Sequence, residues 1–122
     1  MLAYIQRTTR MPVTDPRTSL RGRKLGILLS TKPEHPNLET CLEMSRQALT
    51  RGVDVYLYMV DDGVTNIDDD RILDLGRRGA KLFVCAYGCQ RRRLPITDKA
   101  TYCGLVVLTD LINGCDRFVA LS

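Results

Sequence analysis

The sequence predicts an α/β fold, a three-layer sandwich in which helices flank a mainly parallel sheet of about five strands. Runs dominated by aliphatic and aromatic residues carry this prediction, most clearly at 25–30, 81–85 and 117–121. Such runs are typical of parallel strands that are buried on both faces. Segments with helical spacing separate them, as in βαβ units. The 122 residues suffice for one domain with a single core.

The pattern along the chain predicts each element in turn. The apolar run at residues 25–30 predicts the first strand, and the two prolines within 31–36 predict a loop. Asn37 is the expected N-cap of a helix that ends at Gly52, and the spacing places Cys41 on its buried face. The remaining predicted elements are a strand at 53–60, a turn at 61–64, a helix at 69–78, a strand at 81–85, a helix at 86–93, a polar connection at 97–104, a brief strand at 105–107, a helix at 108–113 and a strand at 117–121.

The net charge of +4 is concentrated near the amino terminus. Residues 1–23 contain five arginines and one acidic residue, whereas residues 24–122 contain 13 basic and 13 acidic residues. The first segment also has two prolines and no sustained apolar periodicity. We therefore interpret residues 1–23 as a basic, flexible N-terminal arm and residues 24–122 as the domain. Because the domain is neutral, we expect no direct binding of nucleic acid.

Hydropathy predicts a cytoplasmic protein. No apolar stretch approaches the roughly 20 residues that cross a bilayer, so no membrane partner is expected. The first residues lack the apolar segment of a secretory signal.

Five cysteines, at positions 41, 85, 89, 103 and 115, are an odd number for a chain without an export signal. This disfavours a framework of disulfides and favours reduced or reactive thiols. Zinc sites usually combine two closely spaced ligand pairs, and this chain has one such pair and a single histidine, His35. No glycine-rich phosphate loop follows the first strand. We therefore expect neither a metal nor a cofactor, and a lone histidine excludes most triad chemistry.

Cys85 is the strongest candidate for a functional residue. It ends an apolar strand, and in parallel sheets the functional groups gather at the carboxyl ends of strands. If 86–93 is helical, Cys85 lies near the helix N-terminus, where free amides stabilise a thiolate. Arg91 and Arg92 add positive charge, and Cys89 lies one turn further on. Cys89, Arg91 and Arg92 are thus candidate auxiliary residues.

Each cysteine also has a structural interpretation. Free cysteine is commonly a small buried residue, and on position alone Cys85 and Cys89 fit a strand end and a helix face as well as they fit chemistry. Cys41 and Cys115 are better explained as core residues. Cys103 lies in a connection, and the sequence leaves its distance from Cys85 open.

The segment around Cys85 resembles a known family. Val84-Cys85-Ala86-Tyr87-Gly88-Cys89-Gln90-Arg91-Arg92-Arg93-Leu94 is similar to the cysteine segment of the DsrE/DsrF-like sulfur-relay proteins, the TusD/DsrE type, in which a strand ends at a cysteine and runs into a helix closing with Arg-Arg-Gly. Asp62-Gly63-Val64 resembles the turn after the second strand, and Cys115-Asp116-Arg117-Phe118-Val119 resembles the last strand. In this chain Arg93 stands in place of the glycine.

The resemblance implies a cytoplasmic protein that accepts sulfane sulfur as a persulfide on Cys85. It then passes the sulfur to a partner protein in a pathway of tRNA thiolation or sulfur oxidation. It also implies sulfur donor and acceptor proteins as partners, and a homo- or hetero-oligomer. Cys89 inherits no role, because many members lack it.

Two other hypotheses fit the sequence. In the first, the chain is a non-catalytic oligomeric or regulatory subunit of a sulfur-relay complex. In the second, it is a redox protein that uses Cys85 and Cys89 as a dithiol. A sulfurtransferase that carries a persulfide is the prediction that unites most of the observations.

Overall fold

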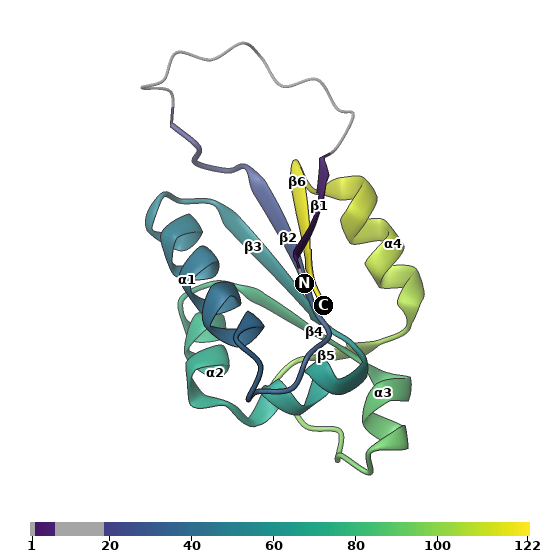
Figure 1. Cartoon of the computed structure of the whole chain (residues 1–122). Helices are drawn as coiled ribbons and strands as arrows, with labels where there is room; N and C mark the ends of the chain where they lie inside the picture. Colours follow the sequence, from purple (N-terminus) through teal and green to yellow (C-terminus); the bar gives the residue numbers. More distant parts are fainter. Residues whose placement is uncertain (1, 7–18) are drawn as a thin grey trace.

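Strands and helices alternate along the chain in the computed structural model, which describes residues 2–6 and 19–122 (Figure 1). The sheet has six strands in the order β1-β6-β2-β3-β4-β5. The elements are β1 Leu2–Gln6, β2 Lys24–Leu29, α1 Asn37–Thr50, β3 Asp54–Met59, the 3-10 helix η1 Asp61–Asp68, α2 Asp70–Arg77, β4 Lys81–Cys85, α3 Ala86–Arg91, β5 Thr101–Cys103, α4 Leu105–Gly114 and β6 Arg117–Leu121.

Five strands run parallel, which confirms the predicted fold class. β2 pairs in parallel with β3 and β6, β3 with β4, and β4 with β5. From β2 to β4 the chain moves one way across the sheet, and α1 and α2 cover one face (Figure 1). The step from β5 to β6 goes back the other way through α4, which lies on the opposite face. Parallel crossovers are right-handed, so reversing the direction places α4 on the other side.

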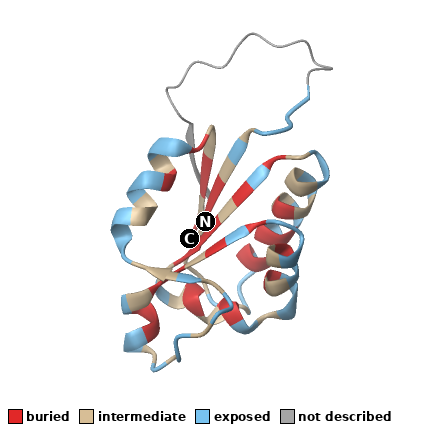
Figure 2. Ribbon diagram, turned by 180° about the vertical axis from the view of Figure 1, so that it is seen from behind, coloured by how far each residue is buried: buried red, intermediate tan, exposed pale blue. Residues whose placement is uncertain are grey.

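The core lies mainly between the sheet and the helices α1 and α2, where Figure 2 shows the densest buried residues. Ile27, Leu57 and Val84 come from three neighbouring strands, and each is fully buried. Leu42 of α1 and Ile72 of α2 pack into the same cluster. Because both helices place their apolar stripe on one face of the sheet, the carboxyl ends of the strands remain free to build a site at the edge.

Residues 2–6 differ from the prediction of an arm without secondary structure. They form β1, which pairs antiparallel with β6 from Leu2↔Leu121 to Gln6↔Arg117. The unpaired edge of β6 offers backbone donors and acceptors to any extended segment that reaches it. The rest of the predicted arm up to residue 18 lies outside the described residues.

The segment after Pro95 was also predicted wrongly. Thr101–Cys103 is the strand, whereas Leu105–Val107, predicted as a strand, is the first turn of α4. Branched apolar residues favour strands, but here Leu105 and Val106 lie on the exposed side of a helix. Gly104 is extended and precedes this helix as its N-cap residue.

One helix start and one turn differ from those expected. Pro36, not Asn37, is the N-cap residue of α1, and no side chain caps that end. Residues 61–64, predicted as a turn, continue into the 3-10 helix η1. Among the helices of the described residues, none is long and apolar enough to cross a membrane.

Arg93 closes α3 in a left-handed backbone conformation, with φ of 56°. The Leu94 amide donates to the Cys89 carbonyl at 2.9 Å, and the Arg93 amide donates to the Gln90 carbonyl at 3.1 Å. These two bonds are those of a Schellman motif, whose left-handed residue is usually glycine. The chain therefore keeps the turn that glycine favours while carrying a side chain there.

We expect Arg93→Gly to raise the free energy of unfolding by about 0.5–1 kcal/mol, because glycine adopts this conformation without a Cβ clash. Chemical denaturation measures the change. Arg93→Ala is the matched control: it removes the same charge but keeps the Cβ atom, so it should change stability by less than about 0.5 kcal/mol. An equal gain in both variants would contradict the backbone argument.

Candidate functional site at the carboxyl end of β4

Cys85 occupies the junction between β4 and α3. It is the N-cap residue of α3, and its Sγ accepts a hydrogen bond from the Gly88 amide at 3.4 Å. A sulfur in this position satisfies a backbone amide that the helix leaves unpaired. The residue is only 5% exposed. The predicted placement at a strand end is therefore correct, and the thiol is more enclosed than a surface nucleophile.

Cys103 lies beside Cys85 in the sheet. The two residues are register partners at the ends of the parallel strands β4 and β5. Paired residues of neighbouring strands project to the same face, so both thiols point to the α4 side of the sheet. Cys103 is half-buried, and its Sγ contacts the Val84 carbonyl at 3.9 Å. The structure thus answers the question that the sequence left open.

Tyr58 completes the site, and sequence analysis missed it. Its hydroxyl donates to the Gly104 carbonyl at 3.0 Å. Burial raises the pKa of Tyr58, and charge on Cys103 and on Cys85 raises it further. The Tyr58 hydroxyl therefore lies near both thiols. A tyrosine in a strand covered on both faces needs a partner for its hydroxyl, and this need is the signal that the sequence offered.

Cys89 lies on the first turns of α3 and is 1% exposed. Burial raises the pKa of its thiol, charge on Cys85 raises it further, and Arg92 acts in the opposite direction. Burial also raises the pKa of the Cys103 thiol, which the nearby Tyr58 hydroxyl partly offsets. Charge on Cys85 thus acts on the thiols of both Cys89 and Cys103. Of these two, only Cys103 has substantial access to solvent.

The two arginines predicted as candidate auxiliary residues, Arg91 and Arg92, contact other groups. Arg92 donates to the Asp62 carboxylate at 2.8 Å and to the Gly88 carbonyl at 3.1 Å. The Arg91 guanidinium lies 5.9 Å from the ring centroid of Tyr87. Arg92 thereby ties η1 to α3 and holds the helix that carries the Gly88 amide.

The Arg92–Asp62 pair should give the fold a specific pH dependence. A hydrogen bond from Arg92 lowers the pKa of Asp62, so the unfolded chain takes up a proton at Asp62 more readily than the folded one. The stabilisation is present above the unfolded-state pKa of about 4 and is lost as the pH falls through the lower folded value. Thermal unfolding measures the difference in unfolding temperature between the wild type and Asp62→Asn, which should be constant from pH 7 to about 5 and shrink below about pH 4. A difference in unfolding temperature that persists at about pH 2 would contradict the predicted role of the Arg92–Asp62 pair.

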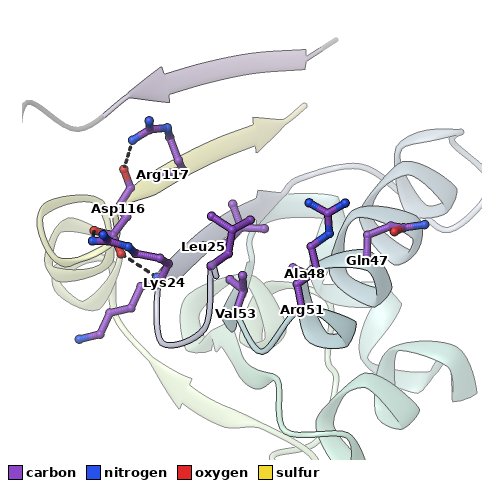
Figure 3. A pocket seen from close by; sticks show the side chains of 10 residues that line it. Lys24, Leu25, Gln47, Ala48, Arg51, Val53, Asp116 and Arg117 are labelled. Atoms are coloured by element: carbon purple, nitrogen blue, oxygen red, sulfur yellow. Dashed lines mark hydrogen bonds and ion pairs between the residues drawn. The ribbon is translucent and has the colours of Figure 1, made fainter. Parts of the chain in front are cut away.

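Two hollows lie away from the Cys85 sulfur. One, of about 470 Å³, lies at the carboxyl end of β2 and is lined by Ser30, Thr31, Lys32, Glu34, His35, Pro36 and Asp62. His35 belongs to this loop, where its Nδ1 accepts from the Asn37 amide at 3.0 Å. The other, of about 460 Å³, lies at the amino ends of β2, β3 and β6 and includes Leu25, Val53 and Arg117 (Figure 3). It is at the opposite end of the strands from Cys85.

The other cysteines belong to the core, as predicted. Cys41 is fully buried on α1, and burial raises its pKa to about 12. Cys115, just before β6, is 2% exposed. Within the described residues, no group of three or more histidine, cysteine, aspartate or glutamate side chains is arranged to hold a metal ion.

The comparisons with known proteins show the fold. No family model matches the chain. No curated protein matches its sequence. Among solved structures, the YchN protein from E. coli superposes with a TM-score of 0.69 and 17% identity, covering 81% of this chain and 99% of that one. A conserved protein of unknown function from Bacteroides thetaiotaomicron, BT1422, superposes with a TM-score of 0.70 and 17% identity, covering 80% and 94%. At this identity the likeness supports the α/β fold, and membership of the DsrE/DsrF-like family stays a prediction.

Proposed function

We propose that the protein is a persulfide carrier that accepts sulfane sulfur on Cys85 and passes it to a partner protein. The observation that carries this proposal is the position of the Cys85 Sγ. It lies at the carboxyl end of a parallel strand and accepts the Gly88 amide at 3.4 Å. An amide donor stabilises negative charge on sulfur. The thiolate is the form of cysteine that attacks a sulfur donor, and it is also the leaving group when an acceptor takes the outer sulfur of the persulfide.

The surroundings of Cys85 suit a sulfur that is handed from protein to protein. Its low exposure slows, without blocking, the reaction of a persulfide with small thiols and oxidants in solution. Exposed apolar side chains lie on the segments that follow β4 and β5, namely Tyr87, Ile96, Leu105 and Val106. In this proposal they belong to the surface on which a partner docks. Sulfur donor and acceptor proteins, in a homo- or hetero-oligomer, are the partners in this proposal.

A non-catalytic subunit is the second candidate, and the burial of Cys85 favours it. A thiol that is 5% exposed and hydrogen-bonded to an amide also fits a helix cap without chemistry. In that case the site would serve assembly, and Cys85 would never carry sulfur.

Loading the reduced protein with inorganic polysulfide separates the two candidates. After removal of excess polysulfide, free thiols and persulfides are alkylated, and the peptides are mapped by mass spectrometry. The carrier predicts an added sulfur atom on the peptide that contains Cys85. Sulfur found on other cysteines only, or on none, would favour the non-catalytic subunit.

A further inference from the structure

The pairing of β4 with β5 brings two thiols together without any covalent bond between them. Cys85 and Cys103 are direct register partners. Neighbouring strands lie about 4.8 Å apart, and disulfides join residues whose Cα atoms are about 4.4–6.8 Å apart. The usual spacing of paired strands thus falls within the range of Cα separations that a disulfide spans.

Tyr58 lies on the same face of the sheet as the two thiols. Its hydroxyl donates to the carbonyl of Gly104, the residue that follows Cys103, at 3.0 Å. Phe83 is the register partner of both Tyr58 and Thr101, and Cys85 follows Phe83 by two residues. Because side chains alternate along a strand, all of these side chains project from one face of the sheet. The two thiols therefore project from the face of the sheet that also carries the Tyr58 side chain.

Cys103 differs from Cys89 in its access to solvent. Cys89 is 1% exposed within α3, whereas Cys103 is half-buried at the edge strand of the sheet. When a second thiol attacks a persulfide, the outer sulfur must be able to diffuse out of the site. A reductant must later be able to reach the disulfide that has formed. Among the two thiols near Cys85, Cys103 meets that requirement.

We propose that Cys103 is the resolving thiol of the site, which discharges a persulfide on Cys85 as sulfide and forms a Cys85–Cys103 disulfide. This inference rests on the proposed function, because it needs a persulfide on Cys85. The Cys103 Sγ attacks the Cys85 Sγ, and a bond forms between these two atoms. The bond from the Cys85 Sγ to the outer sulfur breaks, and that sulfur leaves with the bonding electrons and the proton of the Cys103 thiol as hydrosulfide.

The electron balance of this step needs no further oxidant. The two cysteines together lose two electrons, and the sulfane sulfur gains them. A low-molecular-weight thiol or a dithiol reductant then returns the disulfide to two thiols. The site thus has two outcomes for one sulfur atom: transfer to a docked acceptor, or release as sulfide when no acceptor is bound.

The experiment follows the full-length protein after loading with inorganic polysulfide and removal of the excess. Released sulfide is quantified over time, and peptides are mapped without reduction. The wild type should lose its persulfide, release sulfide and gain a link between the Cys85 and Cys103 peptides. Cys103→Ser should keep the persulfide at least about tenfold longer, because it removes the intramolecular attack. Cys89→Ser is the matched control and should behave like the wild type.

The outcomes distinguish this inference from the proposed function. No sulfur on Cys85 would overturn the proposed function. Sulfur on Cys85 that decays equally fast in Cys103→Ser, or a disulfide between Cys85 and Cys89, would overturn the resolving role alone. Mapping of the wild type needs no variant, so misfolding of Cys103→Ser leaves the test intact. A thiol oxidant applied to the unloaded wild type tests the pairing separately: it should join Cys85 to Cys103, and any other pair overturns the proposal.

Discussion

Cys85→Ser should abolish the loading of sulfane sulfur, with a decrease of at least about a hundredfold. A serine hydroxyl is not a thiolate nucleophile and forms no persulfide. The substitution is well suited to the test because the fold should tolerate it. Serine is a favoured N-cap residue, and its hydroxyl replaces the sulfur as acceptor for the Gly88 amide. The measurement is intact mass and peptide mapping after exposure to polysulfide.

The matched control for this prediction is Cys89→Ser, four residues further along the same segment. Cys89 is buried, and burial raises the pKa of its thiol, so it should take up little sulfur itself. This variant should therefore keep at least about half of the wild-type loading. Equal loading of the wild type and Cys85→Ser would remove Cys85 from the mechanism. A loss in Cys89→Ser but not in Cys85→Ser would move the reactive thiol to Cys89.

The sequence predicted the part of the fold that depends on long apolar segments. The run at 25–30 lies, except for Ser30, in the strand β2, and the run at 81–85 is the strand β4. The spacing around Cys41 does place it on the buried face of α1. These features follow from the burial of apolar side chains, which dominates the free energy of folding and leaves a periodic pattern in the sequence.

The elements that build the second half of the site leave weaker patterns. β5 has three residues, too few for a period of two to be recognised. Its pairing with β4 comes from backbone hydrogen bonds, which carry little information about side-chain identity. The proximity of Cys103 to Cys85 therefore emerged only with the register of the sheet. The branched residues that begin α4 show the converse error, because the helix geometry overrode their preference for strands.

The arginines show what sequence distance leaves open about a site. A run of three arginines after Cys85 suggested positive charge around the thiol. In the structure, Arg92 is directed to Asp62, and Arg93 occupies the left-handed residue that ends the helix. Neither direction follows from sequence distance, because both depend on how η1 and α3 pack.

Gly63→Ala should destabilise the fold by about 3 kcal/mol or more. A Cβ atom at this position would lie 2.0 Å from the Leu29 carbonyl oxygen and 3.0 Å from the Ser30 Cα. Both are backbone atoms at the end of β2, and the same Leu29 carbonyl accepts a hydrogen bond from the Val60 amide at 3.1 Å. Because no side chain can rotate away, the 3-10 helix η1 must move off the sheet, and overpacking of this kind carries a large cost.

The displacement should also reach the sulfur site, since η1 packs against α3. Gly88, whose amide donates to the Cys85 Sγ, faces Val64 of η1 so closely that a Cβ atom there would lie 3.1 Å from the Val64 Cγ1. Gly114→Ala is the matched control, because nothing lies within 4 Å of the position that its Cβ atom would take and alanine favours the helix there. It should leave stability unchanged or raise it by up to about 1 kcal/mol. Chemical denaturation measures both changes, and a cost below about 1 kcal/mol for Gly63→Ala would show that the end of β2 can yield.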